Sequence, residues 1–193
     1  MTFSIGQNVI EIEIRALNLL KKSISKVQFE KAVSYLYKTS GKIIISGIGK
    51  SGHIGSKISS TLSSIGSSSF FLHPSEANHG DLGMIKKEDC MILISNSGES
   101  SELLNLILFC KKIKIPIISI TSELKSTLAK QSSAVLLIPK NVEACPLELA
   151  PTSSTTCTLV IGDALAITLL RKRKFTSKDF LKLHPGGKLG RLL

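Results

Sequence analysis

KIIISGIGKSG, residues 42–52, combines an apolar run with a glycine-rich turn. Three consecutive isoleucines are typical of a buried strand, because β-branched side chains pack well on a pleated surface. Gly47, Gly49 and Gly52 follow, and glycines let the backbone turn tightly and lie close to a ligand. The stretch therefore predicts a strand, a loop and the beginning of a helix.

Four more short apolar runs follow, each bounded by turn or polar residues. The five predicted strands are 42–46, 69–72, 90–95, 116–121 and 134–139. Helical spacing of apolar residues predicts helices at 54–65, 101–113, 125–131, 153–171 and 177–183. Alternation of strands and helices predicts an α/β fold, a three-layer sandwich with a five-stranded parallel sheet flanked by helices.

The N-terminal region has helical periodicity and precedes any strand. Residues 9–37 predict one or two amphipathic helices. The chain has 193 residues, which suits one domain. We therefore expect a helical arm over residues 1–40 that is part of the same domain as residues 41–193.

The chain is basic, with 25 lysines and arginines against 14 acidic residues. A net charge of +11 suits a nucleic-acid binder or a protein with solvated, lysine-rich faces. The lysines are scattered without interleaved aromatic residues, which favours the second interpretation and no nucleic-acid partner. No run reaches the ~18 apolar residues of a membrane span. We see no signal peptide and no paired cysteine spacing, so we expect a cytoplasmic protein without a membrane partner.

The glycine-rich loop fits two nucleotide motifs only superficially. Gly47, Gly49 and Gly52 have the spacing of a dinucleotide fingerprint, but no acidic residue stands about twenty positions later. Lys50 and Ser51 suggest a P-loop, but Ile44 occupies the position of its first glycine. An anion site at a helix N-terminus remains.

The segment SNSGES, residues 95–100, ends the third predicted strand and begins a helix. Ser95, Ser97 and Ser100 offer hydroxyls, Asn96 offers an amide, and Gly98 permits close approach of the backbone. An ordinary helix cap needs only one such residue. The segment therefore favours an anion cradle at the carboxyl end of a strand, where open α/β sheets bind ligands.

Three further segments carry polar residues. His73 and His79 lie in a loop with acidic residues, which is either a metal site or a plain polar loop. Glu143 follows the fifth strand, and Thr152 beyond it is either a site residue or the cap of the next helix. His184 lies near the end of the sequence, where a histidine is usually solvent-exposed.

Taken together, the motifs resemble the arabinose 5-phosphate isomerase family of the SIS (sugar isomerase) domain. The segments that carry the resemblance are residues 47–53, 73–83, 95–100, 143–146, 149–156 and 184–187. It implies interconversion of D-ribulose 5-phosphate and D-arabinose 5-phosphate, the first step towards Kdo of bacterial lipopolysaccharide. It also implies a homotetramer with sites at subunit contacts, and no cofactor.

The resemblance also assigns site residues. It implies the catalytic residues Lys50, Glu102, Glu143 and His184. It implies the phosphate- and substrate-binding residues Ser51, His73, His79, Ser95, Asn96, Ser97 and Ser100. No metal is required, although His73 is also a candidate metal ligand.

Isomerisation through an enediol needs a group that moves a proton between two carbons. We expect Glu102 or Glu143 to be this base, with a pKa that burial raises towards working pH. Lys50 would stabilise the enediolate, and His184 would move protons between oxygens or open the furanose ring.

Proteins that share these SIS-domain motifs differ in domain composition and function, which leaves alternatives to the stand-alone isomerase. Many continue into a pair of CBS domains, whereas this sequence ends at Leu193, so we expect the stand-alone form. A non-catalytic sugar-phosphate sensor would keep the serine loop but could lack the four catalytic residues. An isomerase for another sugar phosphate, or an aminotransferase-type SIS domain, is a rival within the enzymes.

Overall fold

The computed structural model describes residues 2–140 and 142–186. Its centre is a five-stranded parallel sheet in the order β2-β1-β3-β4-β5. The strands are β1 (Ile43–Gly47), β2 (Ser69–Phe71), β3 (Cys90–Ile94), β4 (Ile117–Thr121) and β5 (Ala134–Leu137). The predicted α/β class, its five strands and the three-layer arrangement are confirmed.

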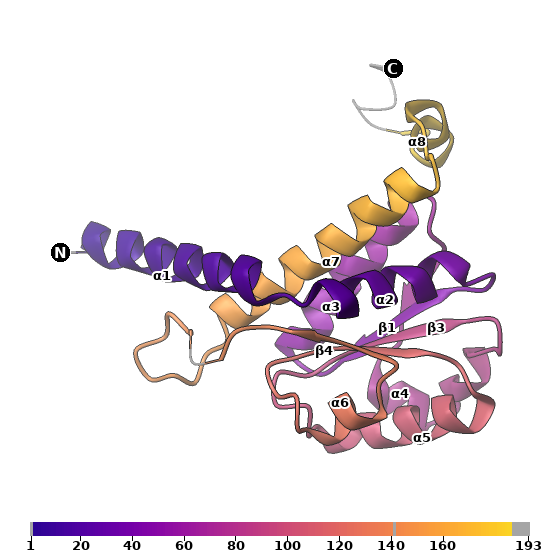
Figure 1. The fold of residues 1–193 in the computed structure, drawn as a ribbon, viewed down its shortest axis with the longest axis horizontal. Coiled ribbons are helices and arrows are strands. Elements are labelled where there is room, and N and C mark those ends of the chain that lie inside the picture. The colour runs from indigo at the N-terminus through magenta and orange to yellow at the C-terminus, as the bar shows by residue number, and fades with distance from the viewer. Residues whose placement is uncertain (1, 141, 187–193) are drawn as a thin grey trace.

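Helices cover both faces of the sheet (Figure 1). The α-helices are α1 (Thr2–Ser23), α2 (Lys26–Lys38), α3 (Lys50–Ser64), α4 (Pro74–Asn78), α5 (Leu104–Ile113), α6 (Thr127–Gln131), α7 (Ser153–Lys172) and α8 (Ser177–Leu183). Two 3₁₀ turns, η1 (Asp81–Met84) and η2 (Ser101–Leu103), lie between them. Helices α4, α5 and α6 cover one face, and α2, α3 and α7 cover the other (Figure 1).

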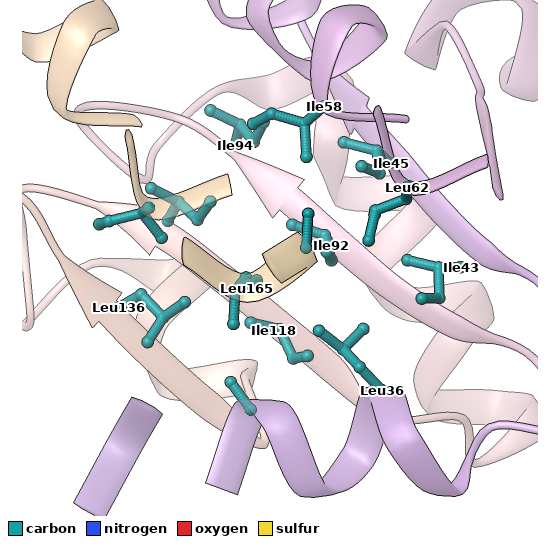
Figure 2. Packing of buried hydrophobic residues seen from close by; sticks show 14 of the residues in the cluster. Leu36, Ile43, Ile45, Ile58, Leu62, Ile92, Ile94, Ile118, Leu136 and Leu165 are labelled. Carbon is teal, nitrogen blue, oxygen red and sulfur yellow. The ribbon is translucent and has the colours of Figure 1, made fainter. Parts of the chain in front are cut away.

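The core follows from the alternation of strand side chains. Ile43 and Ile45 of β1 face the layer that holds α2, α3 and α7, whereas Ile44 between them faces the opposite layer. Leu165 of α7 lies against the first of these clusters (Figure 2) and is fully buried. Because both faces are covered, β1, β3 and β4 are buried along their whole length, which explains their continuous apolar sequences.

The N-terminal helices contribute to this same core. Ala16 and Leu20 of α1, and Leu36 of α2, belong to the cluster formed with α3 and α7. The distal part of α1 projects beyond the sheet (Figure 1). The boundary at residues 40 and 41 stays a prediction.

Helix α7 differs from the expectation that no segment is long and apolar enough to span a membrane. Its 20 residues pass that test by length and composition, with a mean hydropathy of 1.5. Half of the apolar window is buried inside the fold, and α7 packs against α1, α2 and α3. A helix that packs against three others needs apolar side chains on most of its surface, which explains the apolar sequence of α7.

Short elements account for the other differences. Residues 73–83 were expected to form a loop, but Pro74 begins the short helix α4, at the position where proline fits a first helical turn. Helix α3 begins at Lys50 rather than at residue 54, because Gly49 adopts a φ of +58° and turns the chain directly into the helix. The glycine-rich loop is therefore very short.

The cysteines in the apolar runs are core residues, as predicted. Cys90 and Cys110 are fully buried, and burial raises the pKa of each thiol to about 12. These two side chains therefore stay protonated and pack as small apolar groups.

Candidate functional site

Two adjoining cavities of about 320 and 350 Å³ lie where the parallel strands end. Their walls come from the segments that follow β1, β3, β4 and β5, and from the first turns of α7. The cavities share the lining residues Asn96, Glu143, Glu148 and Ser154, so they are immediate neighbours, and we call the two together the cleft. Because the sheet order reverses direction between β1 and β3, the cleft lies where open α/β sheets bind ligands.

Lys50 and Ser51 reach the first cavity from the beginning of α3. Free backbone N–H groups of a first helical turn attract anions, and no acidic residue lies in this turn. Among the described residues, the ammonium of Lys50 forms no ion pair. This side of the cleft is therefore suited to negative charge.

The serine loop after β3, residues 95–100, contributes two of its five polar residues to the cleft. Asn96 and Ser97 are exposed and line the cavities. Ser95 is buried, and its hydroxyl lies 2.8 Å from that of Ser100. Ser95 Oγ also accepts a hydrogen bond from the N–H of Gly98 at 3.0 Å. Ser95 and Ser100 thus shape the loop in this structure, while Asn96 and Ser97 face the cleft.

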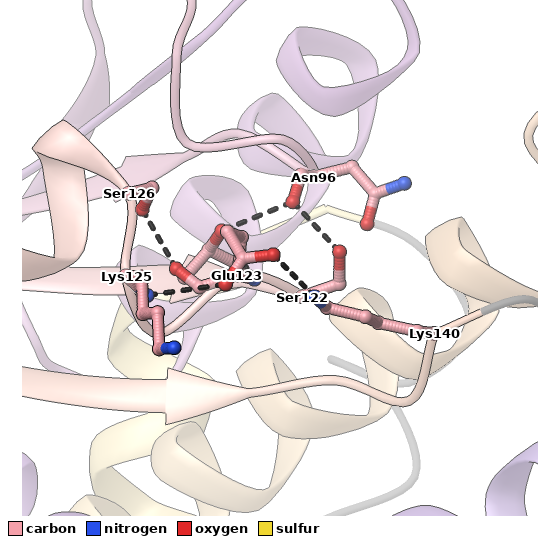
Figure 3. A network of polar contacts seen from close by, with 7 residues as sticks. Asn96, Ser122, Glu123, Lys125, Ser126 and Lys140 are labelled. Carbon is pink, nitrogen blue, oxygen red and sulfur yellow. Dashed lines mark hydrogen bonds and ion pairs between the residues drawn. The ribbon is translucent and has the colours of Figure 1, made fainter.

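Residues at the end of β4 and just after it hold the serine loop in place (Figure 3). The hydroxyls of Thr121 and Ser122 both donate to the backbone oxygen of Asn96, at 3.0 and 2.9 Å. The amide of the Asn96 side chain is turned away from this network (Figure 3). Glu99 accepts a hydrogen bond from the Thr127 N–H at 2.8 Å, and this bond lowers the pKa of Glu99. The sequence had assigned Glu99 no role, and it fixes the loop to α6.

An ion pair between Glu123 and Lys140 forms part of the second cavity's wall. The hydrogen bond from Lys140 lowers the pKa of Glu123. The pair joins the segment after β4 to the segment after β5 (Figure 3). Both side chains are partly exposed, so the pair contributes little to stability and mainly keeps the two segments together.

Glu143 lines both cavities and also caps α7. Its Oε2 accepts hydrogen bonds from Thr152 N at 2.6 Å, Thr152 Oγ1 at 2.9 Å and Ser154 N at 3.3 Å. The hydroxyl of Thr152 also accepts a bond from Ala144 N at 2.8 Å. The sequence left open whether Thr152 is a site residue or the cap of the next helix. Thr152 occupies the cap position but makes no capping bond itself, and the carboxylate of Glu143 makes the capping bonds.

The pKa of Glu143 moves against expectation. Burial of the carboxyl raises it, but the hydrogen bonds from Ser154 and Thr152 together outweigh burial, so the pKa of Glu143 lies below its ordinary value. The expectation that burial would raise the pKa of this base is therefore wrong in net direction. Glu143 is ionised at neutral pH and has Oε1 left to accept further bonds.

Glu102, His73 and His79 are among the predicted residues that line neither cavity in this chain. Glu102 is exposed on η2, and its carboxylate accepts a hydrogen bond from Ser101 Oγ at 3.2 Å. His73 is exposed and caps α4, where its Nδ1 accepts a bond from Ser75 N at 3.2 Å. His79 is exposed at the other end of α4. Across residues 2–140 and 142–186, no three His, Cys, Asp or Glu side chains come together as metal ligands.

His184 lies far from the cleft. It follows α8, stacks on Phe180 with ring centroids 3.7 Å apart, and places Nδ1 2.8 Å from the Phe180 carbonyl oxygen. Helix α7 carries the chain from the cleft to α8, and its 20 residues span about 30 Å. Figure 1 shows α8 beyond the C-terminal end of α7, whereas the first turns of α7 line the cleft. One chain alone does not bring His184 to Lys50 and Glu143. Gly187, the last residue of the motif at residues 184–187, lies outside the described residues.

Sequence reasoning missed several residues of the cleft. Ser154, Thr155 and Thr158 line it from the first turns of α7. Their spacing on one helical face could have suggested this. Glu148 lines both cavities, but an exposed glutamate in a loop has no pattern that distinguishes it.

Comparison with known proteins gives a consistent result. Residues 35–168 match the SIS domain. The chain is 50% identical over 188 residues to the arabinose 5-phosphate isomerase KdsD of Salmonella typhi, and 53% identical over 185 residues to that of Francisella tularensis. These matches cover 97% and 94% of this chain. The chain spans only 57% and 56% of those two relatives' lengths.

Solved structures extend the likeness to the fold. A protein of E. coli CFT073, solved in complex with arabinose 5-phosphate, is 40% identical with a TM-score of 0.91. The alignment covers 95% of this chain and 97% of that one. A Listeria monocytogenes protein, provisionally described as a sugar-phosphate isomerase, is 31% identical with a TM-score of 0.93. That alignment covers 96% of this chain and 97% of the Listeria chain.

Proposed function

Since this chain belongs to the SIS domain family, we propose that it interconverts D-ribulose 5-phosphate and D-arabinose 5-phosphate through an enediol. The observation that carries the proposal is the cleft, where a free lysine, an ionised glutamate and a hydroxyl- and amide-lined loop meet. Support comes from the relative solved with bound arabinose 5-phosphate and from the arabinose 5-phosphate isomerases at 50% identity and above. The reaction would supply the pathway to Kdo and lipopolysaccharide.

The phosphate end of the sugar is assigned to the serine loop. Asn96 and Ser97 would donate hydrogen bonds to phosphate oxygens, and Ser51 would do so from the first turn of α3. The free N–H groups of that turn add positive potential. Ser95 and Ser100 are assigned to the same site, where their hydroxyls, which contact each other at 2.8 Å, would bind phosphate after the loop rearranges.

The proton transfer is assigned to Glu143. In the ketose-to-aldose direction, the base takes a proton from C1, a C1–C2 double bond forms, and negative charge develops on the C2 oxygen. The Lys50 ammonium would stabilise that charge. The proton of the C1 hydroxyl then passes to the C2 oxygen and Glu143 returns its proton to C2, which leaves an aldehyde at C1 and a hydroxyl at C2. Glu143 is preferred to Glu102 because it lines both cavities, whereas Glu102 lines neither.

His184 is assigned to the active site of a neighbouring copy. The proposed homotetramer would bring His184 of one chain to the cleft of another, where it would move protons between sugar oxygens or open the furanose ring. Its distance from the cleft of its own chain supports this arrangement. His73 and His79 would then line the site from a subunit contact, being exposed on α4. A cytoplasmic location is part of the proposal, supported by the unpaired thiols of Cys90, Cys110 and Cys157.

Mixing two inactive variants tests the shared site. We expect His184→Ala and Glu143→Gln each to lose most activity as pure proteins. Co-expressed in equal amounts, they should recover about a quarter of wild-type turnover, because random assembly leaves both groups intact in that fraction of shared sites. The measurement is the specific activity of the purified hybrid oligomers.

A second pair of variants is the matched control. Lys50→Met and Glu143→Gln both alter the cleft of a single chain, so no hybrid site has both groups intact. This mixture should therefore stay inactive. If the mixture with His184→Ala also shows only the summed activities of its two variants, His184 does not act across a subunit contact.

A further inference from the structure

Glu148 is an acidic residue of the cleft that has no role so far. It lies in the segment that joins β5 to α7, residues 138–152. It lines both cavities and is one of only four residues that they share. A ligand that occupies either cavity can therefore contact this side chain.

The carboxylate of Glu148 is free. In the part of the chain that the structure describes, it makes no hydrogen bond and no ion pair, whereas one oxygen of Glu143 already accepts three bonds. An ionised carboxylate only accepts hydrogen bonds, and its two oxygens offer about four lone-pair positions. The groups it can bind directly are therefore donors, such as the hydroxyls of a sugar.

The backbone of Glu148 is strained. Its φ is +55°, which is a left-handed conformation. This conformation is energetically unfavourable for any residue with a side chain, but not for glycine. A hydrogen bond of 2.9 Å from its N–H to the Cys145 carbonyl oxygen closes the turn around it. The fold thus holds a glutamate at a position where glycine would be the more stable choice, as is common where a side chain has a function.

We propose that Glu148 binds hydroxyl groups of the sugar chain and thereby selects a neutral polyol at the junction of the two cavities. This rests on the proposed function, because it assumes a sugar phosphate in the cleft. A carboxylate repels a phosphate group, so the phosphate must bind on the serine-loop side of the junction that Glu148 and Asn96 both line. Glu148 is then a specificity-determining residue, and Glu143 keeps the proton transfer.

Two substitutions at Glu148 separate charge from backbone. Glu148→Gln should raise the KM for ribulose 5-phosphate about 5-fold, because a neutral amide makes weaker hydrogen bonds than a carboxylate. Glu148→Gly should raise it about 10- to 100-fold by removing the acceptor. In both, kcat should stay within about 3-fold, because the chemical groups are untouched. The Tm of Glu148→Gly should not fall, because glycine adopts this φ without strain.

Inhibition by inorganic phosphate shows which end of the substrate Glu148 contacts. Its inhibition constant should not rise in either variant, because Glu148 does not hold the phosphate. If the KM and this constant rise together, Glu148 only shapes the phosphate site. If both fall, it is only a repelling charge. If neither moves, it has no role in binding. Each of these three results overturns the inference.

Matched controls and a binding assay complete the test. Lys114 and Glu88 lie just before β4 and β3 begin, at the end of the sheet away from the cleft. Lys114→Gly relieves a φ of +63°, and Glu88→Gln removes an exposed charge. Both variants should therefore keep wild-type kinetics. Calorimetric titration with arabinose 5-phosphate measures the dissociation constant without turnover. If the wild type binds arabinose 5-phosphate but forms no product, the proposed function fails. The inference about Glu148 is then still decided by the dissociation constant for arabinose 5-phosphate, which must rise in both Glu148 variants.

Discussion

Replacing Glu143 with glutamine is expected to lower the turnover of ribulose 5-phosphate by about 10²- to 10⁴-fold, the usual contribution of a positioned base. Glutamine has nearly the same size but cannot take up a proton from C1. The KM should change much less, because the phosphate contacts that we propose come from Ser51, Asn96 and Ser97, which line the cavities. Steady-state kinetics of the purified variant measure both quantities.

Loss of the Glu143 charge also weakens the cap of α7. Three donors converge on its Oε2, and we expect a stability loss of about 1 kcal/mol, typical of a helix cap. Because the folded-state pKa is lowered, the stabilisation is present above the unfolded pKa of about 4.3 and is lost as the pH falls through the folded value. The stability difference between wild type and variant should therefore shrink on acidification. Denaturant unfolding at pH 7 and at acid pH measures it.

Glu102→Gln is the informative comparison. It removes an exposed carboxylate on η2 that lines neither cavity. Normal turnover in Glu102→Gln with loss in Glu143→Gln assigns the base to Glu143. The reverse result assigns it to Glu102, in which case a neighbouring chain must supply it to the cleft. If both variants keep wild-type turnover, the base is neither residue.

Substitution of Gly98 by alanine is expected to damage the phosphate site. Gly98 adopts a φ of +68°, and an added Cβ would lie 2.5 Å from Ser126 Cβ and 3.1 Å from Thr121 Oγ1. The backbone conformation alone costs about 1–2 kcal/mol for a residue with a side chain. The contact with Ser126 must then push the loop away from α6. Asn96 and Ser97 would lose their position over the cleft.

The expected result for Gly98→Ala is a rise of at least about 10-fold in both the KM for ribulose 5-phosphate and the inhibition constant of inorganic phosphate. Gly6→Ala is the control, because nothing lies within 4 Å of a Cβ at that position. It should keep wild-type kinetics. If Gly98→Ala binds phosphate as tightly as the wild type, the serine loop is not the phosphate site.

The strands were predictable because each is a short isoleucine- or leucine-rich run between turn residues, and burial on both faces requires such runs. The predicted and observed limits of β1 and β3 differ by one residue at an end. Helix α4 was missed because five residues in a polar loop show no apolar period. Only Pro74, at the first helical position, signalled it.

Part of the cleft was predictable for a topological reason. Lys50, Asn96 and Glu143 each follow a strand, and parallel strands end at one edge of the sheet, so their proximity follows from the order of elements. The pKa direction of Glu143 was not predictable, because it depends on hydrogen bonds from Thr152 and Ser154, which lie beyond an irregular loop. His184 was grouped with the cleft by resemblance alone, and the length of α7 separates them within one chain.

The most direct test of the proposed activity is incubation of the purified protein with ribulose 5-phosphate and identification of the product by NMR. We expect arabinose 5-phosphate to form without added metal or cofactor, and the same mixture to be reached from arabinose 5-phosphate. The absence of arabinose 5-phosphate at every pH from about 6 to about 9, the range in which an acid–base catalyst of this kind should work, would contradict it.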